Sequence, residues 1–283
     1  MRKHAIRGLE RYLQATSGMR MMPDFLIVGT QRGGTTSLYR YLAQHPDMAP
    51  TLVSKGVRYF DAEYARGTSW YRGHFPLRAH ARAHQSLRHA SLITGEGSPY
   101  YLFHPLAAER AAATVPRAKI IAMLRNPVSR AYSHYQHEVD GGFEDLPTFE
   151  QAIEAEPTRL TGEAERLVSD GTATSYAHRH HSYLARGRYA EQLEVWLRHF
   201  PREQVHVLRS EDLFGEPETT YADVLAFLEL RPHSLSDYKP YNAHRAPKGM
   251  EAQTRERLES AFAGPNRDLA GLLGDRFTWS FEG

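Results

Sequence analysis

The chain of 283 residues contains no cysteine. That absence excludes disulfide bonds, thiolate-bound zinc and a cysteine nucleophile. Long apolar runs are also missing, since no stretch approaches the ~20 consecutive residues that a membrane-spanning helix needs. The first 22 residues lack a continuous apolar segment and so do not resemble a secretory signal. We therefore expect a soluble, cytoplasmic protein without a transmembrane segment.

The net charge is low as well: 35 lysines and arginines stand against 33 aspartates and glutamates. Because nucleic-acid-binding domains are markedly basic, we expect no nucleic-acid partner. A hydrophobic fraction of 41% is that of a globular protein, and this length is sufficient for one large domain. The basic segment 1–22 predicts an N-terminal helix, with Ile6, Leu9 and Leu13 at helical spacing. It either contacts a membrane surface or a partner, or packs on its own domain, and we favour packing.

Short apolar runs bounded by turn residues predict buried strands at 25–28, 119–124 and 205–208. Amphipathic patterns predict helices at 36–44, 128–138, 189–200, 217–230 and 251–263. Apolar strands that alternate with helices indicate an α/β domain with a mainly parallel sheet. We expect one such domain over residues 23–283, behind an N-terminal arm at 1–22.

A glycine-rich turn follows the first predicted strand, and residues 29–36 read GTQRGGTT. Both glycines and Thr36 match the phosphate loop G-x-x-x-x-G-K-[ST], but Thr35 stands where the pattern has lysine. Backbone N–H groups at the start of the next helix favour an anion, and nearby hydroxyls, including that of Ser37, can donate to it. Without the lysine, hydrolysis of a nucleoside triphosphate is disfavoured. Arg32 places a cation in the loop, so the loop predicts phosphate binding.

A second anion site is predicted at the end of the strand 119–124. Arg125 follows this strand directly, at the edge where open α/β sheets bind their ligands. Its guanidinium suits bidentate phosphate recognition, and Ser133 on the next helix can reach the same oxygens. Two anion sites at two strand ends predict a ligand with phosphates at both ends of a nucleoside.

These motifs resemble those of the sulfotransferase family, whose donor is 3′-phosphoadenosine 5′-phosphosulfate (PAPS). The glycine loop is similar to the family's 5′-phosphosulfate loop, and residues 124–135 are similar to its 3′-phosphate segment. Further matches are KGVRYFD at 55–61, EGSP at 96–99, GRY at 187–189 and EDL at 211–213. The pattern resembles the carbohydrate-type branch, which includes heparan sulfate sulfotransferases, and a soluble bacterial-like member of it.

The resemblance implies a P-loop-like three-layer α/β fold, with helices on both sides of a mainly parallel sheet. It also implies transfer of a sulfuryl group from PAPS to a hydroxyl of a carbohydrate, a glycolipid or another small metabolite. The product would be adenosine 3′,5′-bisphosphate, with no metal required. Residues 140–186 would form an insertion or lid on the acceptor side.

Site residues follow from the same resemblance. Arg32 replaces the loop lysine and would contact the leaving phosphate, while Lys55 would assist at the sulfuryl oxygens. Around the phosphosulfate we expect Gly33, Gly34, Thr35, Thr36 and Ser37. Arg125 and Ser133 would bind the 3′-phosphate, and Lys248 and Gly249 resemble a loop that closes over the nucleotide.

Two positions depart from the heparan pattern. Gly56 stands where that branch has the glutamate taken as the general base, and Gly97 stands where it has lysine. Both losses argue against a heparan-like acceptor. We predict Glu96 as the base, because burial behind an apolar segment raises the pKa of a carboxyl group. His74 and His134 are the alternatives.

Other classes stay open on the sequence alone. One is a P-loop nucleotide kinase or NTPase, against which Thr35 argues. Another is a non-catalytic module that binds nucleotides or glycans. The histidines in HRHH at 178–181 could suggest a metal site, which we disfavour because no carboxylates of fitting spacing lie nearby in the sequence.

Overall fold

The computed structural model describes residues 2–241 and 250–279. Its centre is a five-stranded sheet of order β2-β3-β1-β4-β5, in which every neighbouring pair is parallel. The strands are β1 (Phe25–Gly29), β2 (Met48–Ala49), β3 (Ile93–Gly97), β4 (Lys119–Leu124) and β5 (Val205–Arg209). This sheet confirms the predicted α/β class.

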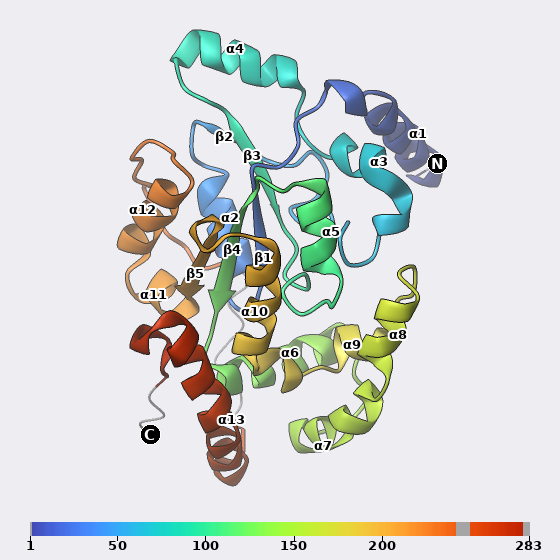
Figure 1. The fold of residues 1–283 in the computed structure, drawn as a ribbon, viewed down its shortest axis with the longest axis vertical. Coiled ribbons are helices and arrows are strands. Elements are labelled where there is room, and N and C mark those ends of the chain that lie inside the picture. The colour runs from blue at the N-terminus through green and yellow to red at the C-terminus, as the bar shows by residue number, and fades with distance from the viewer. Residues whose placement is uncertain (1, 242–249, 280–283) are drawn as a thin grey trace.

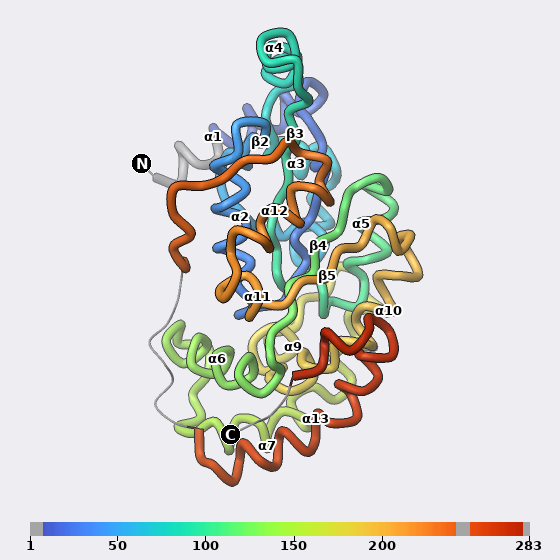
Figure 2. The backbone as a smooth tube through the Cα atoms, turned by 90° about the vertical axis from the view of Figure 1, so that its left-hand side faces the viewer, coloured from blue at the N-terminus to red at the C-terminus, as the bar shows by residue number. Residues whose placement is uncertain are grey.

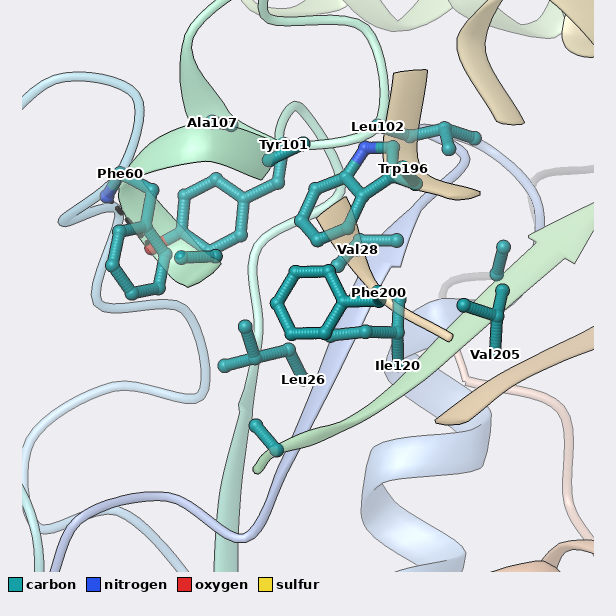
Figure 3. Packing of buried hydrophobic residues seen from close by; sticks show 14 of the residues in the cluster. Leu26, Val28, Phe60, Tyr101, Leu102, Ala107, Ile120, Trp196, Phe200 and Val205 are labelled. Carbon is teal, nitrogen blue, oxygen red and sulfur yellow. Dashed lines mark hydrogen bonds between the residues drawn. The ribbon is translucent and has the colours of Figure 1, made fainter. Parts of the chain in front are cut away.

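Helices cover both faces of the sheet, which makes three layers (Figure 1). Alternate residues of a strand point to opposite faces, so β1 serves two separate cores. Leu26 and Val28 pack in one cluster with α5 (Ala107–Thr114) and α10 (Tyr189–His199). Figure 3 shows Trp196 and Phe200 against the strand side chains of this face. The other face is covered by α2 (Thr35–Leu42), α11 (Ser210–Gly215) and α12 (Pro217–Phe227).

A separate group of helices lies beyond the carboxyl ends of the strands, where the arrowhead of β4 points in Figure 1. It contains α6 (Pro127–Asp140), α7 (Phe149–Leu160), α8 (Glu163–Ser169), α9 (Tyr176–His180) and α13 (Ala252–Leu273). Val128, Phe149 and Phe262 join three of these helices in their own apolar cluster. The segment expected at 140–186 as an insertion or lid is therefore largely helical and closes this end of the domain.

The N-terminal helix α1 (Arg2–Ala15) packs on α3 (Gly67–Gly73). Leu13 is buried there, and a side chain added at Gly73 would lie 3.0 Å from the Leu13 backbone. Helix α4 (Arg78–Arg88) instead projects from the molecule (Figure 2), and His84 ties it to the domain through Asp47, at 2.8 Å. No helix in the described ranges is both long and apolar enough to cross a membrane.

Two strands have no counterpart in the sequence prediction. The short β2 carries only two residues, and β3 reads ITGEG, which lacks a run of apolar or branched side chains. Packing requires its first glycine, since a Cβ at Gly95 would lie 2.6 Å from the Phe25 ring. Helix α13 also extends beyond the expected residue 263 and continues through Pro265.

Candidate active site

The glycine loop joins β1 to α2 at the carboxyl edge of the sheet. The Thr30 N–H donates to the Met123 carbonyl at 2.6 Å, which fixes the loop against the end of β4. A Cβ at Gly33 would lie 2.8 Å from the same carbonyl, so only glycine fits at this approach. Gly34 precedes α2 with a φ of +91° and gives it no side-chain cap. The first N–H groups of α2 are thus left to a bound anion.

Arg125 and Ser133, predicted to share one anion site, lie beside this loop, and Arg32, predicted for the other anion site, contacts both of them. Arg32 Nε donates to Ser133 Oγ at 3.0 Å, and Arg125 Nη1 donates to the Arg32 carbonyl at 3.2 Å. Burial lowers the pKa of Arg32, and the charge of Arg125 lowers this pKa further. Neither guanidinium forms an ion pair with a carboxylate in the described ranges. The charges of Asp140 and Glu138 oppose this lowering without cancelling it, and two like charges held close favour an anionic ligand.

Lys55 lies at the other side of the loop, against the start of α2. Its Nζ donates to Thr35 Oγ1 at 3.0 Å. Burial lowers the pKa of Lys55 to about 8, although the nearby charge of Glu96 acts in the opposite direction. The loop is therefore flanked by Arg32 with Arg125 on one side and by Lys55 on the other.

The other residues predicted to bind the donor are Ser37, Thr36, Lys248 and Gly249, and they differ in their surroundings. The Ser37 hydroxyl accepts from the Tyr241 N–H at 2.9 Å, so it holds a distant segment rather than standing free. Tyr41 supports the same segment by donating to the Tyr238 carbonyl at 2.9 Å. Thr36 is half-buried in the first turn of α2. The predicted residues Lys248 and Gly249 lie outside the described residues.

Glu96 ends its strand fully buried and accepts four hydrogen bonds. The donors are the Val57 N–H at 2.7 Å, the Ser98 hydroxyl at 2.7 Å, and the hydroxyls of Tyr71 and Tyr101, both at 2.9 Å. Burial raises the pKa of Glu96, and the hydrogen bonds oppose this rise. The carboxylate thereby anchors the segment that follows Lys55, an arrangement that suits positioning better than proton removal. The role of Glu96 as the base stays a prediction.

The two alternative bases differ in exposure, since His74 is half-buried and His134 is buried. His74 directly follows α3, and its Nδ1 lies 3.0 Å from the Trp70 carbonyl. His134 is fully buried on α6, and burial lowers its pKa well below the usual value.

A cavity of about 210 Å³ opens beside the glycine loop. Its lining combines loop residue Gln31 with Asp61 and Arg58 from the segment after Lys55, and with residues of α6 and α9. The cavity thus connects the loop to helices that follow it by more than 100 residues. The sequence motif KGVRYFD contained Asp61 and Arg58, but only the fold shows that they share a cavity with α9.

Asp61 is the most unusual group in this cavity. Its side chain is 1% exposed, and neither carboxylate oxygen has a hydrogen-bond partner. Arg58 Nε lies 3.5 Å away. Burial raises the pKa of Asp61 to about 6, although Arg58 and Arg179 act in the opposite direction.

The histidines at 178–181 point to different partners. His178 pairs with the Tyr100 hydroxyl at 2.6 Å, His180 with Glu138 at 2.7 Å, and His181 with the Phe143 carbonyl at 2.9 Å. Within residues 2–241 and 250–279, no three His, Asp or Glu side chains are grouped to ligate a metal.

Fold and site together define an α/β protein of the P-loop-like kind, with a phosphate loop that lacks the lysine of nucleoside triphosphatases. Residues 22–266 match the family described as "Sulfotransferase domain". The chain belongs to the sulfotransferase family.

Relatives and solved structures agree with this assignment. The chain is 29% identical to a membrane-associated sulfotransferase of Dictyostelium discoideum, over 91% of the chain and 66% of that protein. It is 31% identical to a bifunctional heparan sulfate N-deacetylase/N-sulfotransferase of Drosophila melanogaster, over 82% of the chain and 22% of that protein. A crystal structure of a sulfotransferase from Alicyclobacillus acidocaldarius superposes with a TM-score of 0.64 and 31% identity, covering 89% of this chain and 96% of the other. The chain thus spans just under two thirds of the first relative and less than a quarter of the second.

Proposed function

We propose that this protein transfers a sulfuryl group from PAPS to a hydroxyl of an acceptor that is a carbohydrate, a glycolipid or a small metabolite. The observation that carries the proposal is the glycine loop with cations on both sides, in a chain of the sulfotransferase family. When bound, PAPS supplies the sulfuryl group and retains the electrons of the broken bond on its 5′-phosphate.

The donor fits the residues that surround the loop. A ligand with anions at both ends of a nucleoside matches the separate positions of Arg125 with Ser133 and of Lys55 with Thr35. The open N–H groups of α2 lie between them and suit the 5′-phosphate. These groups are all supplied by the protein, so the donor set needs no metal ion.

Each cation has its own role in this proposal. Arg32 belongs to the glycine loop that receives the 5′-phosphate, and its fixed charge stabilises that leaving group, while its bond to Ser133 ties the loop to the side of Arg125. Lys55 lies against Thr35 and can donate a proton, because its pKa of about 8 lies near neutral pH. Lys55 is therefore the cation that we assign to the sulfuryl oxygens.

The cavity beside the loop is the proposed acceptor site. It joins the loop at Gln31, and its walls carry the guanidinium groups of Arg58 and Arg179 with the carboxylate of Asp61. Such a lining suits a hydroxyl-rich acceptor with polar substituents. The segment 140–186 contributes α9 to one wall, in keeping with the expectation of an acceptor-side insertion.

Donor recognition is tested by calorimetry without magnesium. We expect adenosine 3′,5′-bisphosphate to bind much more tightly than adenosine 5′-monophosphate or ATP. Arg125→Ala should weaken bisphosphate binding by about 1.5–3 kcal/mol, the range for a charged hydrogen bond. Arg198→Ala, at an exposed arginine of α10, is the matched control and should bind normally. Equal affinity for the monophosphate and the bisphosphate would contradict the proposal, and preferred binding of ATP would favour a kinase.

Catalysis is tested with ³⁵S-labelled PAPS and a panel of acceptors. The panel contains heparan sulfate, N-deacetylated heparan sulfate, neutral oligosaccharides, glycolipids and simple phenols. Transfer of label to one class identifies the acceptor. Tight binding of the bisphosphate, with neither transfer nor hydrolysis of PAPS, would instead indicate a binding module.

A further inference from the structure

The imidazole of His180 is held at the wall of the acceptor cavity by three contacts. Its Nδ1 lies 2.7 Å from Glu138 Oε2. The Phe143 ring stacks on it with 4.4 Å between centroids, and the Tyr176 ring lies at 4.7 Å on the same measure. A hydrogen bond and two ring contacts leave the imidazole little freedom to rotate.

Glu138 fixes the tautomer of that ring. Burial alone would raise the pKa of Glu138, but hydrogen bonds from His134 and His180 outweigh it and hold the pKa far below the usual value. Glu138 also accepts from the Gln31 amide at 2.9 Å. An ionised carboxylate only accepts, so Nδ1 of His180 must carry the proton. In the neutral ring this leaves a lone pair on Nε2.

Nε2 of His180 has no hydrogen-bond partner within the described ranges, and the side chain remains 11% exposed. The cavity that His180 lines is the one that reaches the glycine loop at Gln31. A carboxylate that orients an imidazole toward a substrate hydroxyl is an arrangement found in enzymes that activate hydroxyl nucleophiles.

We propose that His180 is the general base that removes the proton from the acceptor hydroxyl, with Glu138 as its positioning residue. The proposal rests on the proposed sulfuryl transfer. In the step, His180 Nε2 takes the proton as the acceptor oxygen forms its bond to sulfur. The bond between sulfur and the 5′-phosphate oxygen breaks, and its electron pair stays on that phosphate.

This assignment also explains how the chain functions with Gly56 in place of a glutamate. Glu96 accepts four hydrogen bonds and does not line the cavity. Asp61 does line it, but its side chain is 1% exposed against 11% for His180. Of the three groups, only His180 combines a fixed orientation with an accessible lone pair.

The tautomer can be measured without any acceptor. In the full chain labelled with ¹⁵N-histidine and saturated with adenosine 3′,5′-bisphosphate, long-range ¹H–¹⁵N spectra at pH 7.5 report which ring nitrogen carries the proton. The signal absent from His180→Asn belongs to His180. We expect a proton on Nδ1 and none on Nε2. A proton on Nε2 would overturn the proposal.

Kinetics provide the second measurement. With the best acceptor of the panel, or with water as acceptor in PAPS hydrolysis, His180→Asn should lower kcat at least about 100-fold. Calorimetric affinity for the bisphosphate should stay within about twofold, because the donor contacts lie elsewhere. His199→Asn, at an exposed histidine of α10, is the matched control and should be as active as the wild type. Unchanged kcat in His180→Asn would overturn the proposal.

The variant Glu138→Gln tests whether Glu138 orients His180 or only stabilises the fold. The amide cannot hold His180 as an anion does, so kcat should fall, and the pH at which activity rises should shift. Other groups that influence this profile are those around Glu138 and His180: His134 and His137 of α6, Arg58, Asp61, Arg179 and Tyr176. An unchanged pH profile in a folded Glu138→Gln protein would remove the positioning role. If the wild type itself fails to bind the bisphosphate, the proposed function fails rather than the assignment of His180.

Discussion

Buried carboxylates play opposite parts on the two sides of the candidate site. Glu96 is fully satisfied by donors from three segments, whereas Asp61 is buried with no hydrogen-bond partner. The first arrangement stabilises a fold and the second costs stability. Replacing Glu96 should therefore lower the free energy of unfolding, whereas replacing Asp61 should raise it.

For Glu96→Gln we expect a loss of stability. The amide would turn two N–H hydrogens toward groups that are themselves donors, so the free energy of unfolding should fall by about 1–3 kcal/mol. Urea denaturation measures the change. A variant of native stability whose kcat falls ~100-fold would instead restore Glu96 as the base.

Asp61→Asn should stabilise the protein, and the gain should depend on pH. Burial raises the pKa of Asp61 from 3.8 to about 6, so the wild-type fold loses stability as the pH rises through this window. Asparagine carries no such charge. The gain should approach about 3 kcal/mol above pH 6, from about 2 pKa units, and vanish below pH 4.

Thermal unfolding of both proteins at pH 4, 5, 6 and 7.5 checks this result. Asp268→Asn, at an exposed aspartate of α13, is the control and should show no comparable trend. If Asp61→Asn stabilises the protein equally at all four pH values, the buried charge of Asp61 is not the cause.

At the scale of elements, three strands could be predicted from apolar runs, because 25–28, 119–124 and 205–208 are buried on both faces. The strand β3 could not. Its composition is dictated by neighbours rather than by strand preference, since Gly95 makes room for Phe25. Such a requirement appears only when the two strands are paired.

Gly95→Ala should destabilise the protein by about 1–3 kcal/mol or more, because the new methyl group overlaps the Phe25 ring at 2.6 Å. Gly271→Ala is the matched control, in α13, where nothing lies within 4 Å of the added carbon. There the helix preference of alanine should add up to about 1 kcal/mol. Urea midpoints of the two variants should move in opposite directions, and equal shifts would contradict the packing argument.

For the whole molecule, the sequence indicates the proposed donor site more directly than the cavity proposed for the acceptor. The donor residues Arg32, Arg125 and Ser133 follow strand ends, and the carboxyl ends of parallel strands meet at one edge of the sheet. The cavity, in contrast, unites residues from 31 to 180 that no common spacing links. His180 and Arg179 were visible in the sequence only as part of a histidine cluster.

If the donor and the acceptor bind at these two places, variants of each place should affect only one of the two substrates. Arg179→Ala should raise the acceptor KM about tenfold, as expected for a lost charged contact, and leave affinity for adenosine 3′,5′-bisphosphate unchanged. Arg125→Ala should weaken the binding of adenosine 3′,5′-bisphosphate and leave the acceptor KM unchanged. Initial rates with the best acceptor of the panel, together with calorimetry, distinguish the two patterns. If Arg179→Ala also weakens the binding of the bisphosphate, the two sites are not separate.

The Gln31 side chain connects the glycine loop to the cavity. The Gln31 amide donates to Glu138 and accepts from Arg186, while its backbone belongs to the glycine loop. In the proposed reaction, a shift of Gln31 on donor binding would move the Glu138 carboxylate at the wall of the cavity. By thermodynamic reciprocity, the factor by which one substrate alters the affinity of the other is the same in both directions. Under the proposed function, Gln31 therefore couples the binding of the donor to the binding of the acceptor.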